Sequence, residues 1–375
     1  MPSEVVIIEA VRTSLFQQTA PMPGSPPPDM RRLRAEVVSG LLERAKIDHS
    51  YITSVIEVTE RRTHHCRRAP NNLRPHGNRR IIRVRSSIAA VQHAQSLVQR
   101  KPETVAVISG VSAGWGTTSE AVLDRSQTVP QLCREQVANR WGITRDDQWD
   151  YALNSVQRAD ECARSGDFLR ETIGQDIVPM LGSSGRIAGQ RTRRSNTVAG
   201  SRLIEPTPMR CMSEYSYAAP AQDNPMPNDA CGAVALLIMT AERADELGVH
   251  PRARLVGVET PREATLPGDP AAGFHSVRAF LHSNELTVDR IDHFEVPETG
   301  AVSPLMWLRE FGVSPYMLNP RGGALAFGLL GAAEELRCLA TMITALKDTG
   351  GAYGLVASSR LEGPGTLLIE CLHNV

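Results

Sequence analysis

The sequence predicts an α/β protein in which parallel sheets are covered by helices. The main observation is that short apolar runs typical of buried strands alternate with helix-like patterns in two separate parts of the chain, 4–109 and 254–371. A second is the turn at 319–333, which is rich in glycine and leads directly into a helical pattern. A third is the size and composition: 375 residues with 41% hydrophobic content can bury a core large enough for two domains.

In the first part of the chain, strands and helices follow one another in short units. Apolar runs, helical spacing and the serine that precedes the second helix predict a strand at 4–10, an amphipathic helix at 31–46, a strand at 54–58, a helix with Ser86 as its N-cap, and a strand at 104–109. The proline-rich stretch 21–28 is expected to be an exposed loop.

The second part repeats this order. It is introduced by a strand at 230–239 and a helix at 241–247, and we then expect strands at 254–259, 291–296, 353–358 and 365–371 with helices at 274–283, 302–311 and 334–347. Between the two parts, helices are expected around 130–141 and 145–164, and they precede a long irregular stretch that ends near residue 215. An irregular stretch of this length usually binds something or is mobile.

The glycine turn 319–333 has two interpretations. Gly322 and Gly323 let the backbone come close to another segment or to a ligand. The turn therefore packs a helix tightly against a sheet, or it faces a substrate. The spacing alone favours packing, because glycine turns ahead of helices are common in α/β proteins.

The segment 61–85 differs in character from the rest of the chain. It contains nine arginines and three histidines, and no acidic or aromatic residue. We consider three explanations: a solvated excursion, a polyanion-binding segment, or the product of a frameshift. The lack of aromatic residues argues against stacking on single-stranded nucleic acid. A charged strand would also resist pairing at a sheet edge.

Charge and cysteine content exclude several classes of protein. Lys plus Arg equals Asp plus Glu, so no overall field attracts nucleic acid or a membrane surface. No stretch is apolar over the length of a membrane span, and no N-terminal signal is visible. The seven cysteines form no Cys-x-x-Cys pair, which argues against a zinc site or a disulfide framework. A cytoplasmic protein with reduced thiols and no bound metal is expected.

Several stretches together resemble the thiolase superfamily. NPRGGALAFG is similar to the family motif N-x-N-G-G-A-I-A-L-G-H-P-x-G, and EVVIIEAVRT, WGITRDDQWDYALNSVQRADEC and NDACGAVALLIMTAERADELGVHPRARLVG match other family stretches in the same order. The resemblance covers nearly the whole chain except 57–85 and 180–220. It implies the thiolase fold, which has two similar βαβαβ halves in a five-layer αβαβα arrangement with an inserted loop domain. The N-terminal half is expected at 1–118 and is completed by 219–248, the loop domain at 119–218, and the C-terminal half at 249–375.

The resemblance also implies where the reactive residues should lie. Thiolases join or split acyl-CoA thioesters with a nucleophilic cysteine, a histidine, a second cysteine and an asparagine that holds a water. In this sequence the positions of these four residues are occupied by Arg85, Leu329, Ser359 and Pro297 respectively. An arginine stays protonated and forms no acyl intermediate, and a leucine moves no proton. The resemblance therefore predicts that none of the family's catalytic residues is retained.

Binding of coenzyme A is a separate expectation. Arg194, Gly322, Gly323 and Ala324 are the candidates for a CoA or acyl pocket, because guanidinium groups suit phosphates and the glycine turn matches the family. A solvated basic loop explains the arginines of this region equally well. No cofactor other than a CoA thioester ligand is expected.

Three functions stay open from the sequence. The leading hypothesis is a thiolase-like protein that lacks Claisen chemistry and keeps weak acyl-CoA binding. The second is an active acyltransferase with another nucleophile, Cys231 being the first candidate, whereas Cys338 is expected to be a buried packing thiol. The third is a non-enzymatic scaffold that forms a homodimer or binds a small partner subunit.

Overall fold

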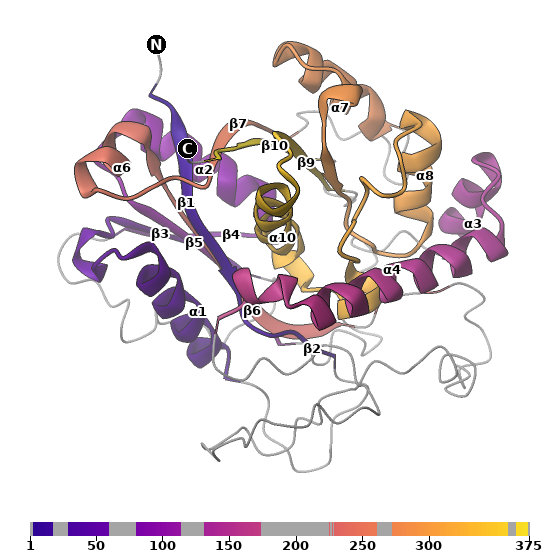
Figure 1. The fold of residues 1–375 in the computed structure, drawn as a ribbon, viewed down its shortest axis with the longest axis horizontal. Helices are drawn as coiled ribbons and strands as arrows, with labels where there is room; N and C mark the ends of the chain where they lie inside the picture. The colour runs from indigo at the N-terminus through magenta and orange to yellow at the C-terminus, as the bar shows by residue number, and fades with distance from the viewer. Residues whose placement is uncertain are drawn as a thin grey trace.

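The structure is a computed structural model that describes residues 3–17, 29–59, 80–113, 131–173, 225, 227, 229–260, 272–358 and 365–373 (Figure 1). The proline-rich loop at 21–28, the long irregular stretch after 173, Arg194 and Ser359 lie outside these ranges. The predicted domain boundaries stay a prediction.

The described strands pair into one ten-stranded sheet. Its order is β4-β3-β5-β6-β1-β7-β10-β9-β8, and the short β2 pairs with β6. The strands are β1 (Val5–Arg12), β2 (Phe16–Gln17), β3 (Ser54–Val58), β4 (Arg80–Val84), β5 (Ala106–Ala113), β6 (Ala230–Thr240), β7 (Ala253–Glu259), β8 (His293–Glu295), β9 (Tyr353–Ala357) and β10 (Thr366–Cys371). The two halves of the chain meet where β1 pairs with β7.

The sheet is mixed, so the predicted parallel arrangement holds for only some of its strand pairs. β3 runs parallel to β4 and β5, and β8 runs parallel to β9. β6 runs antiparallel to both of its neighbours, β1 and β5. The physical reason lies in the connections, since β6 follows a long inserted segment and not a single crossover helix, which would hold it parallel.

Helices lie on both sides of each half of the sheet. They are α1 (Met30–Ala45), α2 (Ser87–Arg100), α3 (Gln131–Arg140), α4 (Arg145–Ser165), α6 (Ala241–Leu247), α7 (Ala272–Ser283), α8 (Val302–Phe311), α9 (Ala324–Phe327) and α10 (Glu334–Thr349). Short 3-10 turns occur at η1 (His49–Tyr51), η3 (Asp167–Arg170), η4 (Val288–Arg290) and η5 (Gly331–Ala333). Each helix and strand that the sequence predicted within these residues is present, with bounds that differ by a few residues.

Three separate apolar clusters show how the layers stack. Along β1, Val5 and Ile7 point into a central cluster with residues of α2 and α10, whereas Val6 and Ile8 point into a second cluster with α1. This is the alternation expected of a strand buried on both faces. A third cluster around Phe294 lies under α7 and α8. The layers are, in order, outer helices, one half of the sheet, central helices, the other half of the sheet, and outer helices. These five layers confirm the predicted fold class.

Capping residues fix the N-termini of α2 and α4. The Ser86 side chain accepts a hydrogen bond from the amide of Ala89, which confirms Ser86 as the N-cap of α2. Thr144 and Asp147 form a capping box at the start of α4. Both helices thus begin where the sequence places them.

The strand β4 was not predicted. It comprises the last residues of the basic segment, and in the described part of the chain it forms the outer edge of the sheet, next to β3. Arg80 and Arg83 are exposed, and Arg83 pairs with Glu57 at 2.8 Å. Ile81 and Ile82 are half-buried and supply the apolar contacts that a strand needs. In the sequence, the many arginines of this segment hide the apolar pattern that would indicate a strand.

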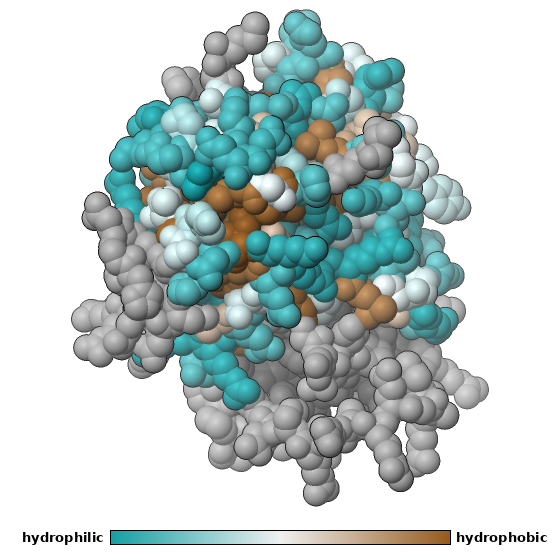
Figure 2. All heavy atoms as spheres, turned by 60° about the vertical axis from the view of Figure 1, so that its left-hand side comes forward, coloured by the Kyte–Doolittle hydropathy of each residue, from teal (hydrophilic) through white to brown (hydrophobic). Residues whose placement is uncertain are grey.

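No helix in the described ranges has the length and apolarity that crossing a bilayer would require. Figure 2 shows a largely hydrophilic face with an apolar area near the centre and smaller apolar patches toward the top and right. Apolar areas of this kind are common on folded proteins.

Candidate functional site

The N-terminus of α2, the turn at η5 and the start of β10 meet in space. The Ser87 hydroxyl donates to the carbonyl oxygen of Ala332 at 2.6 Å. A Cβ atom added to Gly365 would lie 2.7 Å from Cγ2 of Ile88. The carboxyl end of β5 also belongs to this site, because a Cβ added to Gly110 would lie 2.4 Å from Cβ of Ala333. Glycine is required where these segments approach so closely.

Two of the sequence-predicted positions lie near this meeting point. Arg85 is exposed and directly precedes the N-cap of α2. Leu329 is half-buried, and its carbonyl oxygen accepts a hydrogen bond of 2.9 Å from the amide of Ala230. Pro297 is buried two residues after the end of β8. The roles assigned to these residues stay a prediction.

The cysteines of the described residues are poor nucleophiles. Burial raises the pKa of the Cys231 thiol to about 12, and the residue lies within β6, paired with Phe16 and Ala113. Cys338 is fully buried in α10, and burial raises its pKa well above the ordinary value. Because the thiolate is the reactive form, both cysteines remain unreactive, protonated thiols at neutral pH. The burial of Cys338 agrees with its predicted role as a packing thiol.

The glycine turn packs against α4. Asn319 adopts a positive φ of 45°, and its side chain bonds the amide of Val296 at 2.8 Å and the carbonyl of Val296 at 2.9 Å. Gly322 has a φ of +75°, and a Cβ there would lie 2.4 Å from the carbonyl oxygen of Ser155. A Cβ on Gly323 would lie 2.4 Å from Cδ of Glu298. These contacts support the packing interpretation of the turn.

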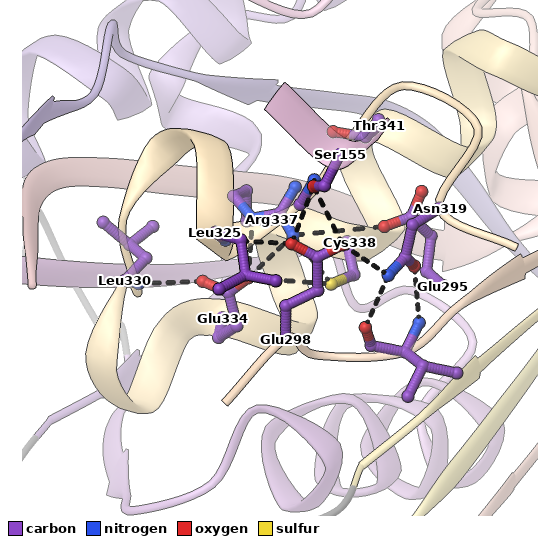
Figure 3. Close-up of polar contacts among 12 residues, drawn as sticks. Ser155, Glu295, Glu298, Asn319, Leu325, Leu330, Glu334, Arg337, Cys338 and Thr341 are labelled. Carbon is purple, nitrogen blue, oxygen red and sulfur yellow. Dashed lines mark hydrogen bonds and ion pairs between the residues drawn. The ribbon is translucent and has the colours of Figure 1, made fainter. Parts of the chain in front are cut away.

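Glu298 is the centre of this packing (Figure 3). Its carboxylate is fully buried and accepts hydrogen bonds from Tyr151 at 2.9 Å, Ser155 at 2.9 Å, Asn319 at 3.2 Å and the amide of Leu325 at 2.9 Å. Burial raises the pKa of Glu298, and these hydrogen bonds partly oppose the rise. With several donors on its two oxygens, Glu298 holds the turn to α4 and is not poised to accept a substrate proton.

A second buried cluster lies at the start of α10 (Figure 3). Glu334 accepts from the amide of Leu330 at 2.8 Å and pairs with Arg337 at 2.7 Å. Arg337 lies 4.0 Å from Glu295, which bonds His293 at 2.8 Å. Through Glu334, this chain of polar groups holds the amide of Leu330 from inside the protein.

Sequence reasoning missed a serine–carboxylate pair in the same region. The Ser358 hydroxyl donates to Oε1 of Glu335 at 2.8 Å, and both side chains are buried. Ser358 follows β9, and its amide donates to the carbonyl of Gly365 at 2.8 Å. The two residues lie 23 positions apart. A signal was present only in the first turn of α10, where two consecutive glutamates in a buried helix are unusual.

Cofactor and metal binding were also considered. Among the described residues no group of three His, Cys, Asp or Glu side chains could hold a metal ion. Gly322, Gly323 and Ala324 are buried beside Ser155 and Glu298. Their assignment to a CoA or acyl pocket stays a prediction, as does that of Arg194.

Comparisons with known proteins agree on one family. The family model described as the thiolase C-terminal domain matches residues 253–369. A β-ketoadipyl-CoA thiolase of Acinetobacter baylyi is 30% identical over 250 residues, which are 64% of this chain and 59% of that protein. The steroid 3-ketoacyl-CoA thiolase FadA6 of Mycobacterium tuberculosis is 27% identical over 242 residues, 64% of this chain and 55% of that protein. The chain thus matches less than two thirds of the length of these relatives.

The fold is also similar along the whole chain. The crystal structure of the Bacillus anthracis acetyl-CoA acetyltransferase superposes with a TM-score of 0.79 and covers 99% of both chains at 20% sequence identity. This likeness shows the fold alone.

Proposed function

Because this chain belongs to the thiolase superfamily, we propose that it is a homologue of acyl-CoA acyltransferases that has lost Claisen condensation and thiolysis. It keeps weak binding of coenzyme A or its thioesters. Known relatives are named as thiolases and acetyl-CoA acetyltransferases, so the ligand class is an acyl-CoA.

The observation that carries this proposal is Arg85 at the N-terminus of α2. In thiolases a cysteine at this helix start takes up the acyl group, and the helix N-terminus stabilises its thiolate. Arg85 directly precedes the N-cap Ser86 and is exposed. A guanidinium stays protonated at working pH and cannot attack a thioester.

Neighbouring side chains do not replace the missing groups. Leu329, at the position of the family's histidine, moves no proton. Ser87, a possible substitute two residues after Arg85, is fully buried and donates to a backbone carbonyl, not to a base. Cys231, the candidate of the alternative hypothesis, has its pKa raised by burial to about 12. Each observation favours loss of the thiolase reaction.

Retention of CoA binding is supported by the glycine turn. Its residues 319–328 keep the family's first asparagine, both alanines and all three glycines, whereas Arg321, Leu325 and Phe327 depart from the pattern. Arg321 pairs with Asp348. Because the turn is held in place by Glu298, a family-type acyl pocket beside it would be preformed.

The test combines turnover and binding. Purified protein is assayed for CoA-dependent cleavage of acetoacetyl-CoA, with the β-ketoadipyl-CoA thiolase relative as a control of the assay, and titrated calorimetrically with CoA and acetyl-CoA. We expect no cleavage and weak binding. Cleavage at a rate typical of enzymes, tens of turnovers per second, would overturn the loss of activity. If neither CoA nor acetyl-CoA gives a measurable heat of binding, the proposal of retained binding is overturned.

A further inference from the structure

We propose that Ser358 and Glu335 form a nucleophile–base pair that hydrolyses acyl-CoA thioesters. This inference rests on the proposed function for its substrate class, and it assigns the same site a different reaction. Ser358 Oγ donates to Glu335 Oε1 at 2.8 Å, which is the distance required for a base to take the hydroxyl proton as attack begins.

The position of the pair is the first supporting observation. The amide of Ser358 donates to the carbonyl of Gly365, and Gly365 lies against Ile88 in the first turn of α2. Ser358 therefore lies close to the place where the start of β10 meets the first turn of α2.

The side chains that surround the pair are the second observation. Ser358 continues the alternation of β9, in which Val356 lies in the central apolar cluster, so its hydroxyl faces α10. Glu335 lies in the first turn of α10, so the two side chains meet in the buried layer between α10 and the end of β9.

Access distinguishes Ser358 from the other serine at this site. Ser358 keeps 7% of its surface exposed, whereas Ser87 has none. Ser358 is also bonded to a carboxylate, whereas Ser87 donates to the carbonyl of Ala332. Of these two serines, Ser358 alone is bonded to a carboxylate, and it keeps the larger exposed fraction.

The reaction balances with water as the second substrate. Ser358 Oγ forms a bond to the thioester carbonyl carbon, and Glu335 accepts the hydroxyl proton. The carbon–sulfur bond then breaks, and CoA leaves as a thiol with that proton. Water next attacks the acyl-serine and gives a proton to Glu335, which returns it to Ser358 as the ester bond breaks. The products are a carboxylic acid and CoA.

The test uses the full chain and two probes. A fluorophosphonate, which labels activated serines without any CoA group, is incubated with the protein, and the labelled peptide is mapped by mass spectrometry. Hydrolysis of acetyl-CoA is followed in parallel by release of free thiol. We expect the label on Ser358 and thiol release that depends on the enzyme.

Variants then assign the roles. Ser358→Ala should abolish labelling and hydrolysis, and Glu335→Gln should lower hydrolysis by about 100-fold, as loss of a general base does. Thr341→Val is the matched control, because it removes a buried hydroxyl of α10 that donates to Glu171 at 3.0 Å and leaves the pair intact. Its rate should equal that of the unaltered protein, with folding of each variant checked by thermal unfolding.

The outcomes separate this inference from the proposed function. If acetyl-CoA binds in calorimetry but neither hydrolysis nor labelling of Ser358 occurs, the serine–carboxylate pair is refuted and the proposed function stands. If acetyl-CoA does not bind, the proposed function loses its ligand, and labelling by the fluorophosphonate alone decides on the pair. Labelling at another serine, or full hydrolysis by Ser358→Ala, also refutes it.

Discussion

The hydroxyl of Tyr151 in α4 donates to the carboxylate of Glu298 at 2.9 Å, although 147 residues separate the two in the chain. Ser155, one helical turn further on, bonds the same carboxylate and also the amide of Gly323 at 3.0 Å. Part of the predicted loop domain is therefore fastened to the glycine turn of the C-terminal half by buried hydrogen bonds.

Loss of Glu298 should destabilise the whole protein. Glu298→Ala leaves the buried donors of Tyr151, Ser155 and Asn319 without their acceptor, and each unsatisfied donor carries a desolvation cost. We expect the free energy of unfolding to fall on the order of 3 kcal/mol. Urea denaturation measures it, with the exposed Glu246→Ala as a control that should change little. An effect no larger than that of the control would show that the cluster is not structural.

The same residue should make stability depend on pH. Burial raises the pKa of Glu298 above the value of 4.5 that it has when unfolded. Its contribution to stability is therefore fully present below that value and is lost as pH rises through the folded pKa. Glu298→Gln removes this titration, so the stability of the variant relative to the unaltered protein should increase as the pH rises above 4.5. Urea denaturation at a series of pH values on both sides of 4.5 checks it, and a constant difference would contradict the raised pKa.

Gly322 should tolerate no side chain, for two separable reasons. It has a φ of +75°, and an added Cβ would lie 2.4 Å from the carbonyl oxygen of Ser155. Gly312 has a similar φ of +64°, but nothing lies within 4 Å of an added Cβ. Gly312→Ala should cost about 1 kcal/mol for the backbone strain alone, and Gly322→Ala about 2 kcal/mol more. Equal losses in thermal or urea unfolding would show that α4 yields to the side chain.

Thiol reactivity should follow burial. Cys231, with a pKa raised to about 12, has very little thiolate at pH 8. A cysteine placed at the exposed position 85 by Arg85→Cys would have an ordinary pKa or a lower one, because the N-terminus of α2 is adjacent. Iodoacetamide should modify it roughly 10³-fold faster than Cys231. Peptide mapping by mass spectrometry gives both rates in one sample, and rapid labelling of Cys231 would revive the alternative nucleophile.

Local sequence signals located most of the described elements. The strand at 54–58 and the helices at 241–247 and 302–311 lie at the predicted residues, because their apolar periodicity and flanking residues are unambiguous. Strand β4 was missed because its arginines dominate the composition, although Ile81 and Ile82 supply the buried contacts. The antiparallel direction of β6 was not predicted, because it depends on a connection whose path the local pattern does not reveal.

By itself the sequence determined the class of fold and the starts of the helices after Ser86 and Thr144, since these depend on neighbours within a few positions in the chain. Only the tertiary structure decided which polar groups meet. Tyr151 finds Glu298, and Ser358 finds Glu335, through the packing of helices against the sheet. A buried carboxylate is hydrogen-bonded by donors that the fold brings next to it. The apolar periodicity of one segment does not indicate which residues those donors are.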